Sequence, residues 1–100
     1  MYPEATDLPD DPTLLACARA GDAAAFRLLA ARHRPGLEAY CVLMLGCPRT
    51  ADRVVRAALA LAWQGIGDSD RRSTPRIWLF WVATQICLAE IERRDEEARA

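Results

Sequence analysis

Apolar residues recur at intervals of three and four positions through most of this chain, and no segment alternates apolar and polar residues in the manner of a half-buried strand. Proline and glycine divide the pattern into short segments. The spacing therefore predicts an all-α fold, a compact bundle of four to five helices. We expect one domain over residues 11–94, preceded by a flexible acidic segment at 1–10 and followed by a charged, solvated tail at 95–100.

Capping residues and proline set the expected helix boundaries in the first half of the chain. Asp11 is the expected cap of a first helix, because Pro12 then occupies the first helical position, where its missing N–H costs nothing. Gly21 is expected to end that helix, and Asp22 to cap the next one. Pro35 is expected to end this second helix or to kink it into a third.

The same signals divide the second half. Glycine and proline within residues 46–48 predict a turn, and Thr50 is the expected cap of a fourth helix. Residues 65–73 are polar and contain two glycines, which predicts a loop. Thr74, followed by proline, is the expected cap of a fifth helix that runs to about Arg94.

Composition excludes several classes of protein. The chain has 100 residues, of which 52% are hydrophobic, and this suffices for one core, in which we expect Trp63 and Trp78 to lie. Its 13 basic and 14 acidic residues give a net charge of −1, unlike a general nucleic-acid-binding protein. The longest apolar run, at residues 77–83, is far shorter than a membrane span, and no basic-then-apolar leader opens the sequence. We therefore expect no membrane association and a cytoplasmic location.

The four cysteines and the single histidine indicate no metal, cofactor or enzyme site. Cys17, Cys41, Cys47 and Cys87 form no C-x-x-C pair, so we expect reduced thiols that behave as small buried hydrophobes. A site of Cys41, Cys47 and His33 departs from the usual zinc-ligand spacing. His33 is instead expected to interact with carbonyls at a helix end. No glycine-rich phosphate loop or nucleophile–base motif is present, which predicts a protein that is not an enzyme.

Several short motifs occur in an order that is typical of one family. They are Leu14-Leu15, Gly21-Asp22 with Ala25-Phe26, Arg32-His33 with Leu37, Gly46, Val54-Val55, Ala62-Trp63, and Trp78-Leu79-Phe80 with Val82-Ala83. Their order and spacing resemble region 2 of bacterial RNA polymerase sigma factors, also called sigma-70 region 2, of the extracytoplasmic-function (ECF) type. The resemblance extends over most of the chain.

This resemblance implies two binding surfaces and no cofactor. In the family, the fourth helix binds core RNA polymerase at the clamp helices of the largest subunit. The last two helices and the loop between them open promoter DNA at the −10 element. The corresponding polymerase- or partner-binding candidates are Asp52, Arg53, Arg56, Ala57, Ala60 and Gln64. The corresponding DNA-binding candidates are Arg71, Arg72, Arg76, Phe80, Trp81, Thr84 and Gln85.

The sequence departs from the family at outward positions. Arg53 stands where the family has Asp, Ala57 where it has Glu, and Leu61 where it has a basic residue. Reversed charge at a complementary interface weakens binding. The fifth helix carries no cation between Arg76 and Arg93, so we expect weak binding to single-stranded promoter DNA, because phosphate contacts supply most of the nonspecific affinity.

Two functions are consistent with these residues. One is a transcription-initiation module that binds polymerase and the −10 element. The other is a sigma-like interaction module that binds an anti-sigma factor or another regulator. Trp81 is expected to share an outward face of the fifth helix with Ile77, Thr84 and Leu88, and this face could pack under the N-terminal segment, bind a partner or form a homodimer. Arg53 has the simpler interpretation of a solvated surface residue.

Overall fold

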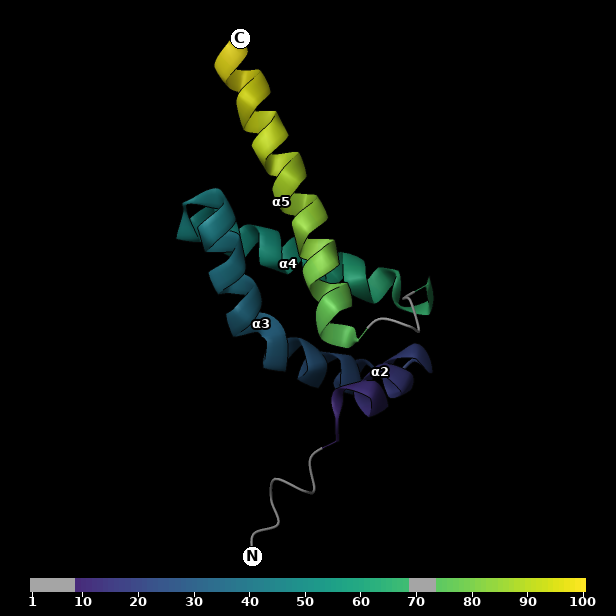
Figure 1. Ribbon diagram of the computed structural model, residues 1–100. Coiled ribbons are helices and arrows are strands. Elements are labelled where there is room, and N and C mark those ends of the chain that lie inside the picture. The colour runs from purple at the N-terminus through teal and green to yellow at the C-terminus, as the bar shows by residue number, and fades with distance from the viewer. Residues whose placement is uncertain (1–8, 69–73) are drawn as a thin grey trace, which may run out of the picture.

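Four α-helices and one short 3-10 turn make up the computed structural model, which describes residues 9–68 and 74–100. The helices are α2 (Asp11–Arg19), α3 (Ala23–Leu45), α4 (Pro48–Gln64) and α5 (Pro75–Arg99), with the turn η1 at Ile66–Asp68. No strand occurs in these two described ranges, so the predicted all-α class is confirmed. In Figure 1, α2 lies at the base of the bundle, α4 crosses behind α5, and the C-terminal half of α5 extends beyond the other helices.

The first helix is capped one residue earlier than predicted. Asp10 is the N-cap, and its side chain accepts a hydrogen bond of 2.9 Å from the backbone N–H of Thr13. The prediction of Asp11 as the cap is wrong, because Asp11 lies inside the helix and pairs with α3. Its carboxylate lies 3.1 Å from Arg32 Nη1 and 2.6 Å from His33 Nε2. His33 therefore contacts this carboxylate rather than the helix-end carbonyls that we expected.

Two of the other three caps are as predicted. Asp22 accepts hydrogen bonds from two backbone N–H groups at the start of α3, and the hydroxyl of Thr74 accepts one from Ile77 N–H at the start of α5. Thr50 is not the cap of α4, which begins after Cys47. Pro48 follows Cys47 directly and occupies the first turn, where proline is favoured, so Thr50 lies within the helix.

Two helices are longer than the sequence predicted. Pro35 lies inside a single continuous helix, α3, which curves along its length in Figure 1. The predicted second and third helices are therefore one bent element, which ends at Gly46 with the positive φ of 73° that glycine tolerates. Helix α5 continues past Arg94 to Arg99, so the charged tail is helical although exposed. Arg93 bonds Glu90 and Glu97 on the same helix, and pairs at such spacing support an exposed helix.

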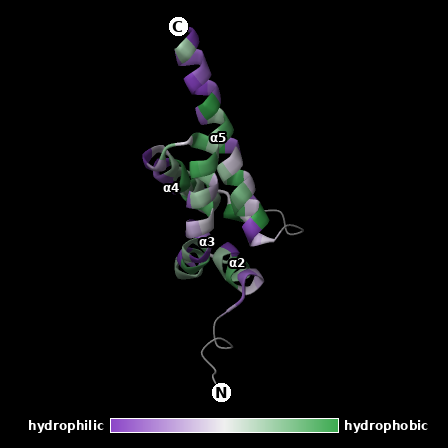
Figure 2. Ribbon diagram, turned by 60° about the vertical axis from the view of Figure 1, so that its left-hand side comes forward, coloured by the Kyte–Doolittle hydropathy of each residue, from purple (hydrophilic) through white to green (hydrophobic). Residues whose placement is uncertain are grey.

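The core is built from small and branched side chains contributed by all four helices. The buried hydrophobic residues are Leu14, Leu15, Ala18, Ala25, Phe26, Leu29, Leu37, Cys41, Leu45, Ala51, Val54, Val55, Ala58, Ala62, Leu79, Ala83 and Cys87. Figure 2 shows hydrophobic residues along the middle of α5 and hydrophilic ones toward its C-terminus. Trp63 and Trp78 pack at the edge of this core and are half-buried rather than enclosed. Cys17 is exposed, contrary to the expectation that all four thiols are buried.

Candidate functional site

The outward face of α4 presents most of the predicted partner-binding residues to solvent. Arg53, Ala57, Ala60 and Gln64 are exposed, as is Arg56, whose side chain is 72% accessible. On the opposite face of the same helix, Val55 is completely buried. The apolar stripe of α4 thus points these side chains outward, and a partner that approaches this face meets two arginines followed along the helix by short alanine side chains.

Acidic side chains already neutralise part of this face. Asp52, at its edge, lies 3.3 Å from Arg34 Nη2 on α3 and 3.0 Å from Arg56 Nη2 one turn along α4. Arg53 Nη2 lies 4.0 Å from a carboxylate oxygen of Glu90 on α5. Sequence reasoning missed Arg34 and Glu90, because their neighbours come from other helices. Asp52 is thus an internal counter-ion of two arginines as well as a candidate partner contact.

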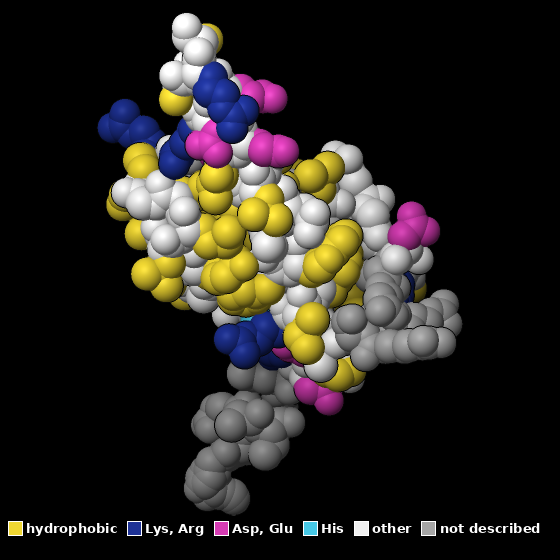
Figure 3. Space-filling view, turned by 45° about the horizontal axis from the view of Figure 1, so that its top comes forward, with side chains coloured by type: hydrophobic (Ala, Val, Ile, Leu, Met, Phe, Trp, Pro, Cys, Tyr) yellow, Lys and Arg dark blue, Asp and Glu magenta, His cyan; other side chains and the backbone are white. Residues whose placement is uncertain are grey.

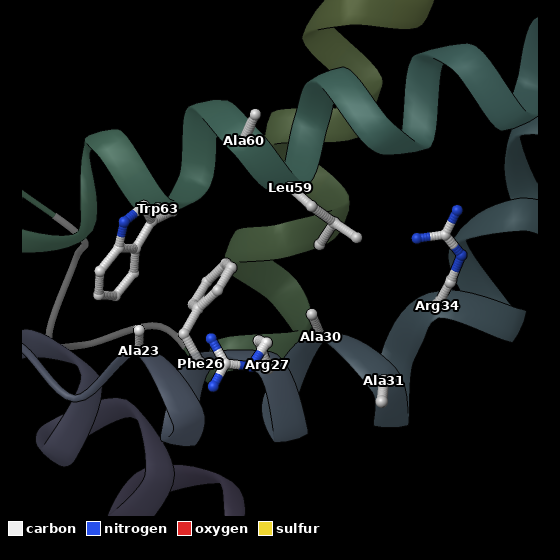
Figure 4. A pocket seen from close by; sticks show the side chains of 9 residues that line it. All are labelled: Ala23, Phe26, Arg27, Ala30, Ala31, Arg34, Leu59, Ala60 and Trp63. Atoms are coloured by element: carbon white, nitrogen blue, oxygen red, sulfur yellow. The ribbon is translucent and has the colours of Figure 1, made fainter.

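An apolar groove of about 500 Å³ lies beside this face, between α3 and α4. Figure 4 shows the aromatic rings of Phe26 and Trp63 turned toward one another across it, with ring centroids 5.3 Å apart. Alanines from both helices line the rest, together with Leu59, and Arg27 and Arg34 place guanidinium groups at its edge. Within residues 9–68 and 74–100, Arg27 has no ion-pair partner. Only Ala60 of this groove was among the predicted site residues.

Three of the predicted DNA-binding residues lie along one stripe of α5 that meets α3. The Arg76 guanidinium lies 5.3 Å from the centroid of the Phe80 ring, and that ring packs edge-on against Tyr40, also at 5.3 Å. The Thr84 hydroxyl donates to the carbonyl of Phe80 and lies 2.7 Å from the Tyr40 hydroxyl. The expectation that Thr84 shares an outward face with Ile77 is therefore wrong, because Tyr40 covers Thr84.

The neighbouring stripe of α5 is more accessible. Trp81 is 61% exposed and Ile77 is 60% exposed, and Leu88 continues this apolar surface toward the C-terminus. Trp81 and Gln85 also line a second cavity of about 370 Å³, between α5 and the C-terminal end of α4, where Leu61 contributes another exposed apolar side chain. Figure 3 shows hydrophobic side chains gathered over the middle of one face of the molecule. Arg71 and Arg72 lie outside the described residues.

Cysteines and acidic groups form no cluster in the described residues that could hold a metal ion. His33 lies against Asp11, and the Cys41 sulfur lies against that of Cys87. Cys47 is half-buried at the start of α4. There the Thr50 hydroxyl and nearby backbone N–H groups lower the pKa of its thiol to about 7.

No helix in the part of the chain that the structure describes is long and apolar enough to cross a membrane.

Comparison with known proteins identifies the family. The model of the sigma-70 region 2 family matches residues 29–97. The match runs from the first third of α3 through α4 and along most of α5, and it covers more than half of the chain. Comparison with curated proteins and with solved structures gives no match. The chain therefore belongs to the sigma-70 region 2 family.

Proposed function

We propose that this domain acts in transcription initiation as region 2 of an ECF-type sigma factor. It binds core RNA polymerase, at the clamp helices of the largest subunit, through the outward face of α4. Family membership supports the general role. The surface is assigned from the two sides of α4. Its apolar side is buried, while Arg53, Ala57 and Gln64 point to solvent. A cytoplasmic location is part of this proposal, because that is where a polymerase-binding domain acts.

The second part of the proposal concerns promoter DNA. Helix α5 contacts the −10 element with Arg76 and Phe80 and with the adjacent side chains Trp81 and Gln85, whereas Thr84, which Tyr40 covers, is not part of this contact. Exposed aromatic rings provide stacking surfaces for unpaired bases, and arginines provide charge for phosphates. Because Arg76 is the one cation that α5 places near these rings in its described first turns, contact with single-stranded DNA is weak without polymerase.

A pull-down with core RNA polymerase tests the α4 surface. Ala57→Arg places a bulky cation at the centre of the face without removing any internal contact, and it should lower affinity for polymerase at least about tenfold. Asp52→Arg should also lose retention. Ala16→Arg is the matched control, because Ala16 is also an exposed alanine within a helix but lies on α2. Equal retention of the Ala57 and Ala16 variants would contradict the proposed surface.

A second function is favoured by the charge of the same region. Arg53 and Arg56 stand on α4, and Arg27 at the groove is without an ion pair among the described residues. A sigma-like module with this surface binds an anti-sigma factor or another regulator that offers acidic side chains, and it engages polymerase weakly. This alternative predicts no retention on polymerase by the wild-type domain. It also predicts that Ala57→Arg leaves binding of an acidic regulator intact.

The exposed stripe of Ile77, Trp81 and Leu88 adds a third proposal, a homodimer through α5. Apolar patches that stay exposed in a folded domain mark partner sites. Light scattering at high protein concentration tests this proposal. A mass near twice 11.1 kDa that Trp81→Glu returns to 11.1 kDa is the expected result, and a wild-type mass that stays near 11.1 kDa would rule the dimer out.

A further inference from the structure

Two cysteine sulfurs meet in the centre of the bundle. Cys41 on α3 and Cys87 on α5 are separated by 46 positions in the sequence, yet their Sγ atoms lie 3.5 Å apart, with Cys87 as the hydrogen-bond donor. Both side chains are completely buried. Neither belongs to the surfaces proposed above for polymerase and DNA.

Polar contacts on both sides of the pair fix α5 against α3. Toward the start of α5, the Tyr40 hydroxyl lies 2.7 Å from the Thr84 hydroxyl. Toward its end, Arg94 Nη1 donates a hydrogen bond of 2.9 Å to the carbonyl of Leu45. The two sulfurs are therefore held in register between these contacts. A disulfide bond is about 2.05 Å long, so the two sulfurs must approach each other by about 1.5 Å to form one.

We propose that Cys41 and Cys87 are a disulfide-forming pair, and that their oxidation fastens α5 to α3 inside the core. With hydrogen peroxide as the oxidant, one thiol is converted to a sulfenic acid and one water is released. The second thiol then attacks that sulfur, the S–S bond forms, and the hydroxyl leaves as a second water. The two sulfurs together lose two electrons and two protons, which the peroxide takes up.

The other two cysteines react before this pair. Cys17 is exposed, and the environment of Cys47 lowers the pKa of its thiol to about 7, so both are open to peroxide. Burial, together with the neighbouring Cys87 thiol, raises the pKa of Cys41 to about 12. A buried thiol reacts slowly, since the reactive species is the thiolate. Oxidation of the pair therefore requires opening of the core around α5, and it is slower than oxidation of Cys17 and Cys47.

The experiment uses the full chain with Cys17→Ala and Cys47→Ala, which leaves only the buried pair. The folded variant is incubated with hydrogen peroxide, then unfolded and treated with iodoacetamide. We expect a mass lower by about 2 Da with no alkylation. Trypsin should release a linked product that contains residues 77–93 and the peptide that carries Cys41. Because a cross-link restrains the unfolded chain, the thermal midpoint should rise by roughly 10 °C and return on reduction.

One control variant and one independently determined reaction time complete the test. Adding Cys41→Ala to the same background should abolish both the linked peptide and the thermal shift. The time that the unfolded variant needs to oxidise in the same peroxide, multiplied by the protection factor of the α5 amides from hydrogen exchange, gives the expected oxidation time of the folded pair. If both cysteines are still fully alkylated after several such times in peroxide, or are linked only between two chains, the proposal is overturned and the sulfurs serve merely as small apolar side chains.

Discussion

At the scale of single residues, one acidic side chain joins each successive pair of helices. Asp11 joins α2 to α3, Asp52 joins α3 to α4, and Glu90 joins α4 to α5 through Arg53. Exposed ion pairs contribute little to stability, so packing carries the fold. These ion pairs instead determine which charged side chains remain available to a binding partner. The carboxylate of Asp52 is already shared by two arginines, which leaves the outward face of α4 with a positive character.

Glu90 gives this domain a pH dependence. A hydrogen bond from Arg93 holds the pKa of Glu90 below its ordinary value of 4.5; partial burial opposes this, while the charges of Arg93, Arg53 and Arg94 add to it. A depressed pKa in the folded state stabilises the fold above the ordinary pKa, and this contribution is lost as the pH falls through the folded-state value. Urea unfolding should therefore show a smaller loss of stability from about pH 5 to about pH 3 in Glu90→Gln than in the wild type.

Glu92→Gln is the control for this titration, because Glu92 is exposed and makes no ion pair with the residues that the structure describes. It should lose stability with falling pH as the wild type does. A Glu90→Gln variant with the same acid sensitivity as the wild type would show that the arginines around Glu90 do not act on folding.

The hydroxyl pair of Tyr40 and Thr84 allows a second residue-scale prediction. Thr84 donates to the Phe80 carbonyl, so Tyr40 must donate to Thr84. Tyr40→Phe should lower the free energy of unfolding by about 0.5–1.5 kcal/mol, the net value of such a bond. In a double-mutant cycle with Thr84→Val, measured by urea unfolding, the double variant should lose less than the sum of the single losses. Additive losses would mean that the two hydroxyls do not interact.

At the scale of elements, local signals predicted which helices form but placed some ends wrongly. Asp10 and Asp11 are adjacent acids, and either could cap a helix. Asp10 is the N-cap, because Arg32 and His33, far along the sequence, bind Asp11. The outward side of α4 could be predicted, because it follows from helical periodicity alone. The groove beside it could not, because it requires knowing that Trp63 packs against Phe26.

Two neighbouring positions on α5 test how this helix is oriented. Leu79 is 1% exposed and Ile77 is 60% exposed, although they stand two residues apart. Leu79→Ala should destabilise the domain by about 2–5 kcal/mol, because it leaves a cavity among packed side chains. Ile77→Ala should change stability by less than about 0.5 kcal/mol. Thermal or urea unfolding measures both values. Similar losses for the two variants would mean that α5 is rotated about its own axis relative to the orientation described here.

At the scale of the whole molecule, the balance of charge limits how this domain meets DNA. With 13 basic and 14 acidic residues, it exerts no long-range attraction on a polyanion. Many of its arginines, moreover, are held by carboxylates: Arg34, Arg53, Arg56, Arg93 and Arg94 all have acidic neighbours. In the proposed function, binding of promoter DNA would therefore depend on a few local contacts and on polymerase.

The salt dependence of binding to a −10-type single strand measures those contacts directly. Arg71, Arg72 and Arg76 are the cations among the DNA-binding candidates of the sequence, and each neutralised phosphate of a single strand contributes about −0.7 to the slope of log affinity against log salt concentration. Fluorescence anisotropy should therefore give a slope no steeper than about −2. Arg76→Ala should make that slope shallower by about 0.7, whereas Arg99→Ala, at the opposite end of α5, should leave it unchanged. A slope steeper than about −4 would mean that arginines outside the proposed set, such as those on α4, also contact the strand.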